Sequence, residues 1–240
     1  MDNLRGKGLV ISERAIFWYD KAMARLILLR HLESKWNLEN RFSGWVDIPL
    51  CEEGIARVGE IAGKVFSNKI DMAYSSPLFR NQDTLVRILN VAGKYPIFIY
   101  LDKGKMKDWG DYTDISEFDL PVYISEALNE RHYGALQGLN KEDAAKKFGE
   151  EKVRLWRRSY NIAPPGGESL KDVIKRTTPF YKKYIENDLK KGKNVLVVAS
   201  HNALRAIIKY IEKISDDDII NLEIPFGGLI IYEDGKKIQN

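Results

Sequence analysis

Two of the three histidines in this chain of 240 residues follow short apolar runs and have an arginine close by. His31 comes after residues 26–29 with Arg30 beside it, and His201 comes after residues 195–199 with an arginine four residues on. Such runs are typical of buried parallel strands, and ligands bind at the carboxyl ends of these strands. A neutral imidazole can act as a covalent nucleophile, and a fixed arginine stabilises charge on a phosphoryl group. The two histidines therefore indicate a site that binds an anion and transfers a phosphoryl group.

Further charged side chains fit this chemistry. Arg80 follows an expected strand end at residues 75–77 and opens a helix, whose N-terminus favours anions. Glu130 can act as an acid–base carboxylate. A second anionic group could bind Lys141, Arg157 and Arg158. Taken alone, each residue also has a structural interpretation, such as a solvated arginine on a helix or a carboxylate paired with its neighbour.

Strands and helices alternate along the chain, which predicts an α/β fold with a mainly parallel sheet. Apolar, β-branched runs predict strands at residues 25–29, 72–74, 97–101, 195–199 and near 229–232. Helical spacing predicts helices at residues 54–66, 80–91, 140–148, 150–160, 170–189 and about 203–213. Asn140 and Ser169 stand at positions that favour helix caps, and Pro179 should kink the long helix.

One segment breaks this rhythm. Residues 102–122 are polar, contain Gly104, Gly110 and Pro121, and show no sustained period, which predicts a surface insertion. Residues 1–23 have no counterpart in the pattern, and we interpret them as an N-terminal extension. The remaining residues, 24–240, show no clear boundary and are expected to form a single catalytic domain.

The composition excludes several classes of protein. Hydrophobic residues make up 44% and charged residues 30%, as in globular proteins. A net charge of +4 is too small to indicate nucleic-acid binding, although it suits a small anionic substrate. No stretch has the apolar length of a membrane span, and the first residues do not resemble a signal peptide. With Cys51 as the only cysteine, an intrachain disulfide is excluded, and we expect a cytoplasmic protein.

Several stretches resemble the cofactor-dependent phosphoglycerate mutases of the histidine phosphatase superfamily. Residues 30–37, RHLESKWN, are similar to the signature RHGESxWN, and residues 39–47, ENRFSGWVD, to the segment ENRFTGWxD. Residues 128–141, LNERHYGALQGLNK, match the LNERHYGxLQGLNK stretch of the mutase branch, and residues 156–160 match WRRSY. Residues 75–80, 167–170, 203–206 and 224–225 resemble further family segments, so the resemblance covers roughly residues 24–232.

The resemblance implies a three-layer α/β fold, with helices flanking a mainly parallel sheet, and an activity. That activity is the metal-free interconversion of 3-phosphoglycerate and 2-phosphoglycerate in glycolysis and gluconeogenesis, primed by 2,3-bisphosphoglycerate. His31 would carry the phosphoryl group and Glu130 would be the general acid–base group, while Arg30, Arg80 and His201 would hold the phosphate. Substrate contacts are implied for Asn37, Ser43, Gly44, Tyr133, Lys141, Arg157, Arg158 and Asn202. A homo-oligomer is also in keeping with the family.

Two departures from the family pattern concern the catalytic residues. Leu32 stands where the family has glycine, and its side chain could crowd the pocket. Residues 199–206, ASHNALRA, correspond to AHGNSLRA. An ungapped alignment places Ser200 at the catalytic position, whereas deletion of the glycine places His201 there. We favour the deletion, because a loop after a strand can absorb one residue.

Two alternatives to the mutase follow from these departures. A phosphatase acting on a small phosphoester is favoured by the short stretch between Arg158 and Glu168, which would leave the pocket open to water. A catalytically weakened homologue that binds phosphometabolites is favoured by Leu32 and the shortened loop at His201. Retention of the cationic residues 141, 157 and 158 favours the mutase, because a plain phosphatase need not bind the carboxylate of the mutase substrate.

Overall fold

A seven-stranded sheet forms the centre of the computed structural model, which describes residues 24–239. The strand order is β3-β4-β2-β5-β1-β6-β7, and the first five strands of this order are parallel. β6 and β7 add an antiparallel hairpin at one edge. The strands are β1 (Arg25–Arg30), β2 (Met72–Ser75), β3 (Tyr95–Tyr100), β4 (Asp119–Ile124), β5 (Val195–Ala199), β6 (Leu229–Glu233) and β7 (Lys236–Gln239).

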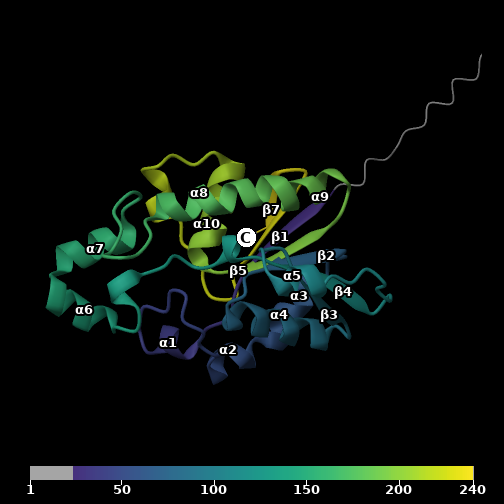
Figure 1. Cartoon of the computed structure of the whole chain (residues 1–240), viewed down its shortest axis with the longest axis horizontal. Helices are drawn as coiled ribbons and strands as arrows, with labels where there is room; N and C mark the ends of the chain where they lie inside the picture. Colours follow the sequence, from purple (N-terminus) through teal and green to yellow (C-terminus); the bar gives the residue numbers. More distant parts are fainter. Residues whose placement is uncertain (1–23, 240) are drawn as a thin grey trace, which may run out of the picture.

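Helices cover both faces of this sheet, which confirms the predicted three-layer, mainly parallel α/β fold (Figure 1). The α-helices are α1 (Lys35–Leu38), α2 (Glu52–Ala56), α3 (Val58–Phe66), α4 (Phe79–Val91), α5 (Lys105–Trp109), α6 (Lys141–Phe148), α7 (Glu150–Arg158), α8 (Leu170–Phe180), α9 (Glu186–Lys190) and α10 (His201–Glu212). A π-helical turn, η3 (Tyr181–Ile185), joins α8 to α9. Short 3₁₀ turns are η1 (Glu126–Leu128), η2 (Gly134–Leu136) and η4 (Asp218–Asn221). Within residues 24–239, no helix is long and apolar enough to cross a membrane.

Alternation along the strands divides the apolar core into two layers. In β1, Ile27 and Leu29 pack with α3 and α4, whereas Leu26 and Leu28 pack with α8, η3 and α10. All four side chains are almost fully buried, and such burial contributes about 1.5–3 kcal/mol for each. The core therefore holds β1 and β5 firmly at the centre of the sheet, where the two histidines follow.

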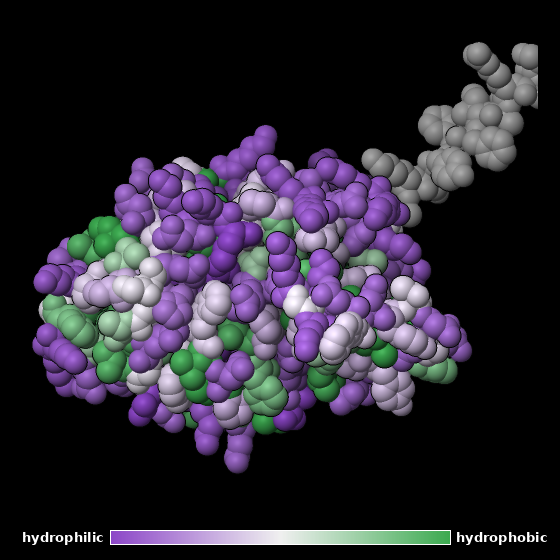
Figure 2. Space-filling view, in the orientation of Figure 1, coloured by the Kyte–Doolittle hydropathy of each residue, from purple (hydrophilic) through white to green (hydrophobic). Residues whose placement is uncertain are grey.

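A third and smaller apolar cluster lies away from the sheet. It joins α6 and α7 to the loops that carry Phe42 and Leu136. Figure 1 shows α6 and α7 at one end of the molecule, and Figure 2 shows hydrophobic residues at this end and along the lower part of a face whose upper part is mainly hydrophilic. We call residues 141–158 the arm. This cluster packs the arm beside the pocket, because Phe42 belongs both to the cluster and to the pocket lining.

The expected insertion at residues 102–122 is wrong at its C-terminal end. Residues 102–118 are exposed almost throughout and contain only α5, but residues 119–122 belong to β4, between β3 and β2. Pro121 lies opposite Ile97 of β3, and β4 pairs with β2 only from Val122 onward. The proline thus lies before the part of β4 that pairs with strands on both sides. In that part, a residue without an N–H would remove a hydrogen bond from the sheet.

Other elements differ from the predictions in detail. The helix expected at residues 54–66 is two helices, because the backbone at Arg57 (φ −86°, ψ −3°) separates α2 from α3. α10 begins at His201 rather than Ala203, because Ser200 alone connects it to β5. The capping residues Asn140 and Ser169 are confirmed, and η3 interrupts the α-helical pattern just after Pro179, where a kink is expected. The extension at residues 1–23 lies outside the described residues.

Candidate active site

A pocket opens where β1, β2 and β5 end, as expected for the carboxyl edge of a parallel sheet. Eight arginine or lysine side chains and two carboxylates line it within the described part of the chain. All thirteen residues that the sequence assigns to the site lie on this lining: Arg30, His31, Asn37, Ser43, Gly44, Arg80, Glu130, Tyr133, Lys141, Arg157, Arg158, His201 and Asn202. The strong excess of positive charge makes the pocket suitable for a ligand with more than one negative charge.

His31 lies at the floor of the pocket, directly after β1. Its backbone N–H donates to the carbonyl of Ala199 in β5 at 3.2 Å, which ties the two strand ends together. Its ring Nδ1 lies 2.7 Å from the carbonyl oxygen of Leu32. A carbonyl can only accept a hydrogen bond, so Nδ1 carries the proton of the neutral ring and Nε2 keeps its lone pair. The local fold therefore leaves Nε2 with a free lone pair, as a nucleophilic nitrogen requires.

The surroundings of His31 also favour its neutral form. Burial lowers the pKa of His31 well below its usual value of 6.5, and the positive charges of Arg80 and Arg30 lower it further. At neutral pH the imidazole is thus uncharged, as a nucleophilic imidazole must be. The same two arginines would stabilise an anion bound in front of the ring.

Arg30 reaches the pocket because β1 ends at this residue. Its guanidinium lies 3.7 Å from the centre of the Phe226 ring and donates to the carbonyl of Ile224. Burial lowers the pKa of Arg30 to about 10, so the side chain is still charged at neutral pH. Adjacent residues of a strand point to opposite faces, but Arg30 and His31 both line the pocket, because the strand ends between them.

Arg80 is the second residue of α4 and is almost fully buried. It donates to the carbonyl of Gly44 at 2.7 Å and to that of Val46 at 3.1 Å, which joins α4 to the loop containing Ser43. Gly44 has φ +53°, and a Cβ atom there would lie 2.2 Å from the side-chain oxygen of Gln137. Glycine at this position therefore permits the close packing that holds Arg80 in place.

Ser200 and His201 have distinct environments. Ser200 is fully buried, its hydroxyl accepts a hydrogen bond from Asn81 Nδ2 at 3.1 Å, and it is absent from the pocket lining. His201 lines the pocket and lies 3.3 Å from Glu223 through Nε2. Burial lowers the pKa of His201, although the hydrogen bond to Glu223 opposes this shift. The geometry favours His201, and not Ser200, as the residue that lies beside His31 in the pocket.

This geometry predicts a clear ranking of two substitutions. His201→Ala should slow phosphoryl transfer by about 10²-fold, the scale of removing one electrostatic donor from an active site. Ser200→Ala should slow it by less than about fivefold, because the hydroxyl faces the protein interior. Single-turnover transfer rates of the two purified variants, compared at equal thermal stability, test the ranking. The reverse order would support the ungapped alignment.

The carboxylate of Glu130 accepts several hydrogen bonds. Its Oε1 accepts from the backbone N–H of Arg131 at 2.7 Å and from Asn202 Nδ2 at 2.5 Å. Burial alone raises the pKa of Glu130, but the charges of His201 and Arg80 and these hydrogen bonds together lower it. The carboxylate is therefore ionised at neutral pH and can accept a proton from a substrate hydroxyl.

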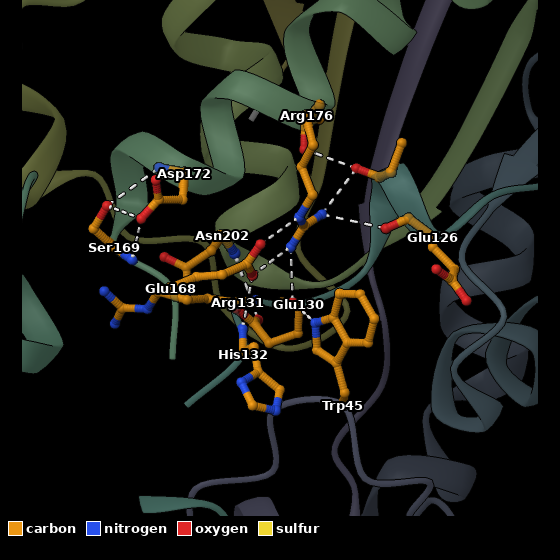
Figure 3. A network of polar contacts seen from close by, with 12 residues as sticks. Trp45, Glu126, Glu130, Arg131, His132, Glu168, Ser169, Asp172, Arg176 and Asn202 are labelled. Atoms are coloured by element: carbon orange, nitrogen blue, oxygen red, sulfur yellow. Dashed lines mark hydrogen bonds and ion pairs between the residues drawn. The ribbon is translucent and has the colours of Figure 1, made fainter. Parts of the chain in front are cut away.

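A network around the loop of residues 129–133 fixes Glu130 (Figure 3). Arg176 makes two bonds to Glu168, at 2.8 and 2.9 Å, and also donates to the carbonyl of Glu130 at 2.9 Å. Glu168 accepts the backbone N–H of His132 at 2.9 Å, and Trp45 donates to the carbonyl of Glu130 at 2.6 Å. Together these contacts hold the backbone at Glu130 and His132, and so they fix the position from which the Glu130 side chain enters the pocket.

A second group of cations lies on the arm side of the pocket. Burial lowers the pKa of Lys141, and the neighbouring charges of Arg157, Arg30 and Arg158 lower it further. Burial, followed by the charge of Arg158, likewise lowers the pKa of Arg157. Crowded positive groups of this kind gain stability when an anion binds between them.

Leu32 does not narrow the pocket. Its side chain is fully buried in the core layer with α3 and α4, and its backbone N–H donates to the Thr84 hydroxyl at 3.0 Å. A Cβ atom on Gly227 would lie 3.2 Å from Leu32 Cδ2, so the leucine packs beside a position without a side chain. The concern that Leu32 crowds the nucleophile is therefore not supported by the packing.

Sequence reasoning did not assign several pocket residues to the site. These are Arg41, Phe42, Arg131, Arg205, Glu223 and Phe226. Arg131 has a detectable signal, since it lies inside the LNERHYG stretch. It is buried with two guanidinium nitrogens that have no hydrogen-bond partner, as expected for a side chain that awaits an anion. Glu223 and Phe226 come from a loop before β6 that only the tertiary fold brings to the pocket.

Comparison with known proteins identifies the family. The model of the histidine phosphatase superfamily (branch 1) matches residues 26–117 and 113–237. The chain belongs to this superfamily. Three solved structures have the same fold at 20–23% sequence identity. One is a mycobacterial glucosyl-3-phosphoglycerate phosphatase in complex with VO3, which has a TM-score of 0.69 over 87% of this chain and 92% of that one. The other two are an Escherichia coli putative alpha-ribazole-5'-P phosphatase (TM-score 0.68) and Bacillus stearothermophilus YhfR (TM-score 0.69). Each alignment covers 90% of this chain and 94% of the other.

Curated relatives are closer in sequence. The chain is 49% identical over 214 residues to a 2,3-bisphosphoglycerate-dependent phosphoglycerate mutase of Methanococcus vannielii, covering 88% of this chain and 90% of that protein. It is 46% identical to the protein of the same name from Chlamydia pneumoniae (88% and 94% covered) and 40% identical to that from Protochlamydia amoebophila (88% and 95% covered). These relatives therefore place the chain within the mutase branch of the superfamily.

Proposed function

We propose that this protein is a 2,3-bisphosphoglycerate-dependent phosphoglycerate mutase. The observation that carries the proposal is one pocket with two anion subsites. His31, Arg30 and Arg80 form the first subsite, and Lys141 and Arg157 lie on the arm side. Mutase substrates carry a phosphate and a carboxylate, so they need two cationic regions and a nucleophile within one pocket. The names of the curated relatives support the same activity.

The reaction begins with transfer of a phosphoryl group from 2,3-bisphosphoglycerate to His31. Nε2 attacks phosphorus, the bond from phosphorus to the ester oxygen breaks, and that oxygen takes a proton from solvent water. Arg30 and Arg80 would stabilise the charge on the transferring oxygens, which is most of the catalysis in phosphoryl transfer. His201 would hold the group from the other side.

The second half returns the phosphoryl group to a monophosphoglycerate. The free hydroxyl of 3-phosphoglycerate attacks the phosphohistidine, Glu130 accepts the hydroxyl proton, and 2,3-bisphosphoglycerate forms. After the bound intermediate reorients, its other phosphoryl group passes to His31, and Glu130 returns the proton to the leaving oxygen. The products are 2-phosphoglycerate and a phosphorylated enzyme, so atoms and charge balance over the cycle.

The remaining expectations belong to this proposal. Asn37, Ser43, Gly44, Tyr133, Arg158 and Asn202 would contact the substrate along the pocket wall. The reaction requires no metal, because arginine side chains supply the positive charge that Mg²⁺ supplies in other phosphoryl transfers. We also propose a cytoplasmic location, a homo-oligomeric state, and a small phosphometabolite as partner in place of nucleic acid or membrane.

One assay distinguishes the proposal from its alternatives. Incubation with 3-phosphoglycerate and catalytic 2,3-bisphosphoglycerate should yield 2-phosphoglycerate with little inorganic phosphate, measured by ³¹P NMR. Chelation by EDTA should leave the rate unchanged. Inorganic phosphate as the main product would establish a phosphatase instead. Absence of both products, with substrate binding retained, would establish the non-catalytic homologue.

A further inference from the structure

Glu223 is a carboxylate in a pocket otherwise built for anions. It lies two residues after η4, in the loop that leads to β6, and it contacts two different parts of the pocket. Its Oε1 pairs with Arg158 at the end of the arm, and its Oε2 lies 3.3 Å from His201 Nε2 at the start of α10. Both of these residues belong to the predicted ligand-binding set. A side chain of the protein thus already contacts two of the groups that the ligand would use.

The two carboxylates of the pocket differ in how they are held. Glu130 is 7% exposed and accepts backbone and side-chain hydrogen bonds from Arg131 and Asn202, which fix it in place. The side chain of Glu223 is 55% exposed, and its ion-pair contacts within the described residues are to the guanidinium of Arg158 and the ring of His201. Glu223 is therefore free to rotate into solvent once a competing anion takes these partners.

The backbone that carries Glu223 is held independently of its side chain. The next residue, Ile224, accepts a hydrogen bond from Arg30, and Arg57 donates to the carbonyl of Phe226 at 2.8 Å. The N–H of Gly227 donates to the carbonyl of Arg30 at 3.1 Å. Release of Glu223 consequently requires only side-chain rotation, and the loop that supports Arg30 stays in position.

Glu223 also joins the arm to the core. Arg158 is the last residue of α7, and polar links at this end of the arm add to the small apolar cluster that packs the arm against Phe42 and Leu136. Arg131 supplies a deeper link, through a bond to the carbonyl of Arg157 at 2.9 Å. Glu223 supplies the link at the mouth, and it is the one that a ligand anion can replace.

We propose that Glu223 is an internal competitor for the anion subsite formed by Arg158 and His201, and that ligand anions bind by displacing it. The inference rests on the proposed function only for the identity of the ligand. While Glu223 occupies its partners, it balances part of the pocket's positive charge and holds the arm to the core. An incoming phosphate takes over both partners and leaves Glu223 to solvent. Ligand affinity is lower by the free energy of the contacts that are given up.

The test is the affinity of inorganic phosphate for Glu223→Gln, which removes the charge and keeps the shape. Phosphate should bind this variant about fivefold more tightly, the scale of a half-exposed ion pair. Glu151→Gln is the matched control, because Glu151 pairs with Arg154 on the same helix α7 and does not line the pocket. Its phosphate affinity should equal that of the unmodified protein. Isothermal calorimetry gives both dissociation constants.

Several results would overturn the inference. The first is unchanged or weaker phosphate binding by Glu223→Gln. The second is an equal increase of phosphate affinity in Glu151→Gln, and the third is that none of the proteins binds phosphate. Glu223→Ala should tighten binding as well, which guards against an effect peculiar to glutamine. Titration with 2,3-bisphosphoglycerate tests the proposed function separately. A protein that binds phosphate but not the bisphosphate would fail as a mutase, while the phosphate data would still decide the role of Glu223.

Discussion

Replacing His31 by asparagine should abolish covalent phosphorylation of the protein and lower mutase turnover by a factor on the order of 10⁴ or more, as for loss of other enzymatic nucleophiles. The expectation follows from the position of Nε2, which keeps its lone pair because Nδ1 bonds to the Leu32 carbonyl. Asparagine is polar and close in size, so the buried site stays filled. Incubation with ³²P-labelled 2,3-bisphosphoglycerate and detection of acid-labile label on the protein measures the effect.

His132→Asn provides the matched control for this labelling experiment. His132 is not part of the pocket lining, and its ring Nδ1 lies 3.1 Å from the carbonyl oxygen of Gly166. This variant should accept close to one phosphoryl group per chain, as the unmodified protein does. Labelled His31→Asn would show that another residue is the nucleophile, and His201 would then be the first to examine.

The regular parts of the fold could be predicted from the sequence because burial leaves a strong pattern. β5 is wholly apolar between polar ends, and its predicted bounds, Val195 to Ala199, agree with the structure. β4 was missed because Asp119 and Pro121 interrupt its apolar run, although the strand lies inside the sheet. The break at Arg57 has no proline or glycine to mark it, so the helical spacing of apolar residues predicted one continuous helix there.

The site could be predicted as far as local motifs carry it. Residues such as Lys141 and Arg157 lie in stretches that resemble the family closely, and the structure brings them to the same pocket as His31. The preference for His201 over Ser200 could not be decided from the alignment itself, since a one-residue shift at a strand end changes which side chain faces the pocket. Glu223 carried no motif, because its role depends on two partners far from it in the chain.

Replacing Glu130 by glutamine should lower the rate of phosphoryl transfer to 3-phosphoglycerate by about 10²–10⁴-fold, the usual contribution of a general acid–base group. Glutamine keeps the size of the side chain and can still accept from the backbone N–H of Arg131. It cannot take the proton of the attacking hydroxyl. Rapid-quench measurement of phosphohistidine decay in the presence of 3-phosphoglycerate gives the transfer rate.

The leaving group separates this chemical role from a structural one. Phosphorylation of His31 by 4-nitrophenyl phosphate needs no acid, because nitrophenolate is a stable leaving group. Glu130→Gln should therefore be phosphorylated by this ester within about tenfold of the normal rate, because this step does not use general acid catalysis. Glu126→Gln, an exposed change in the neighbouring turn η1, should leave both reactions unchanged. Equal losses with both phosphoryl donors in Glu130→Gln would mean that Glu130 positions the pocket, and that another group moves the proton.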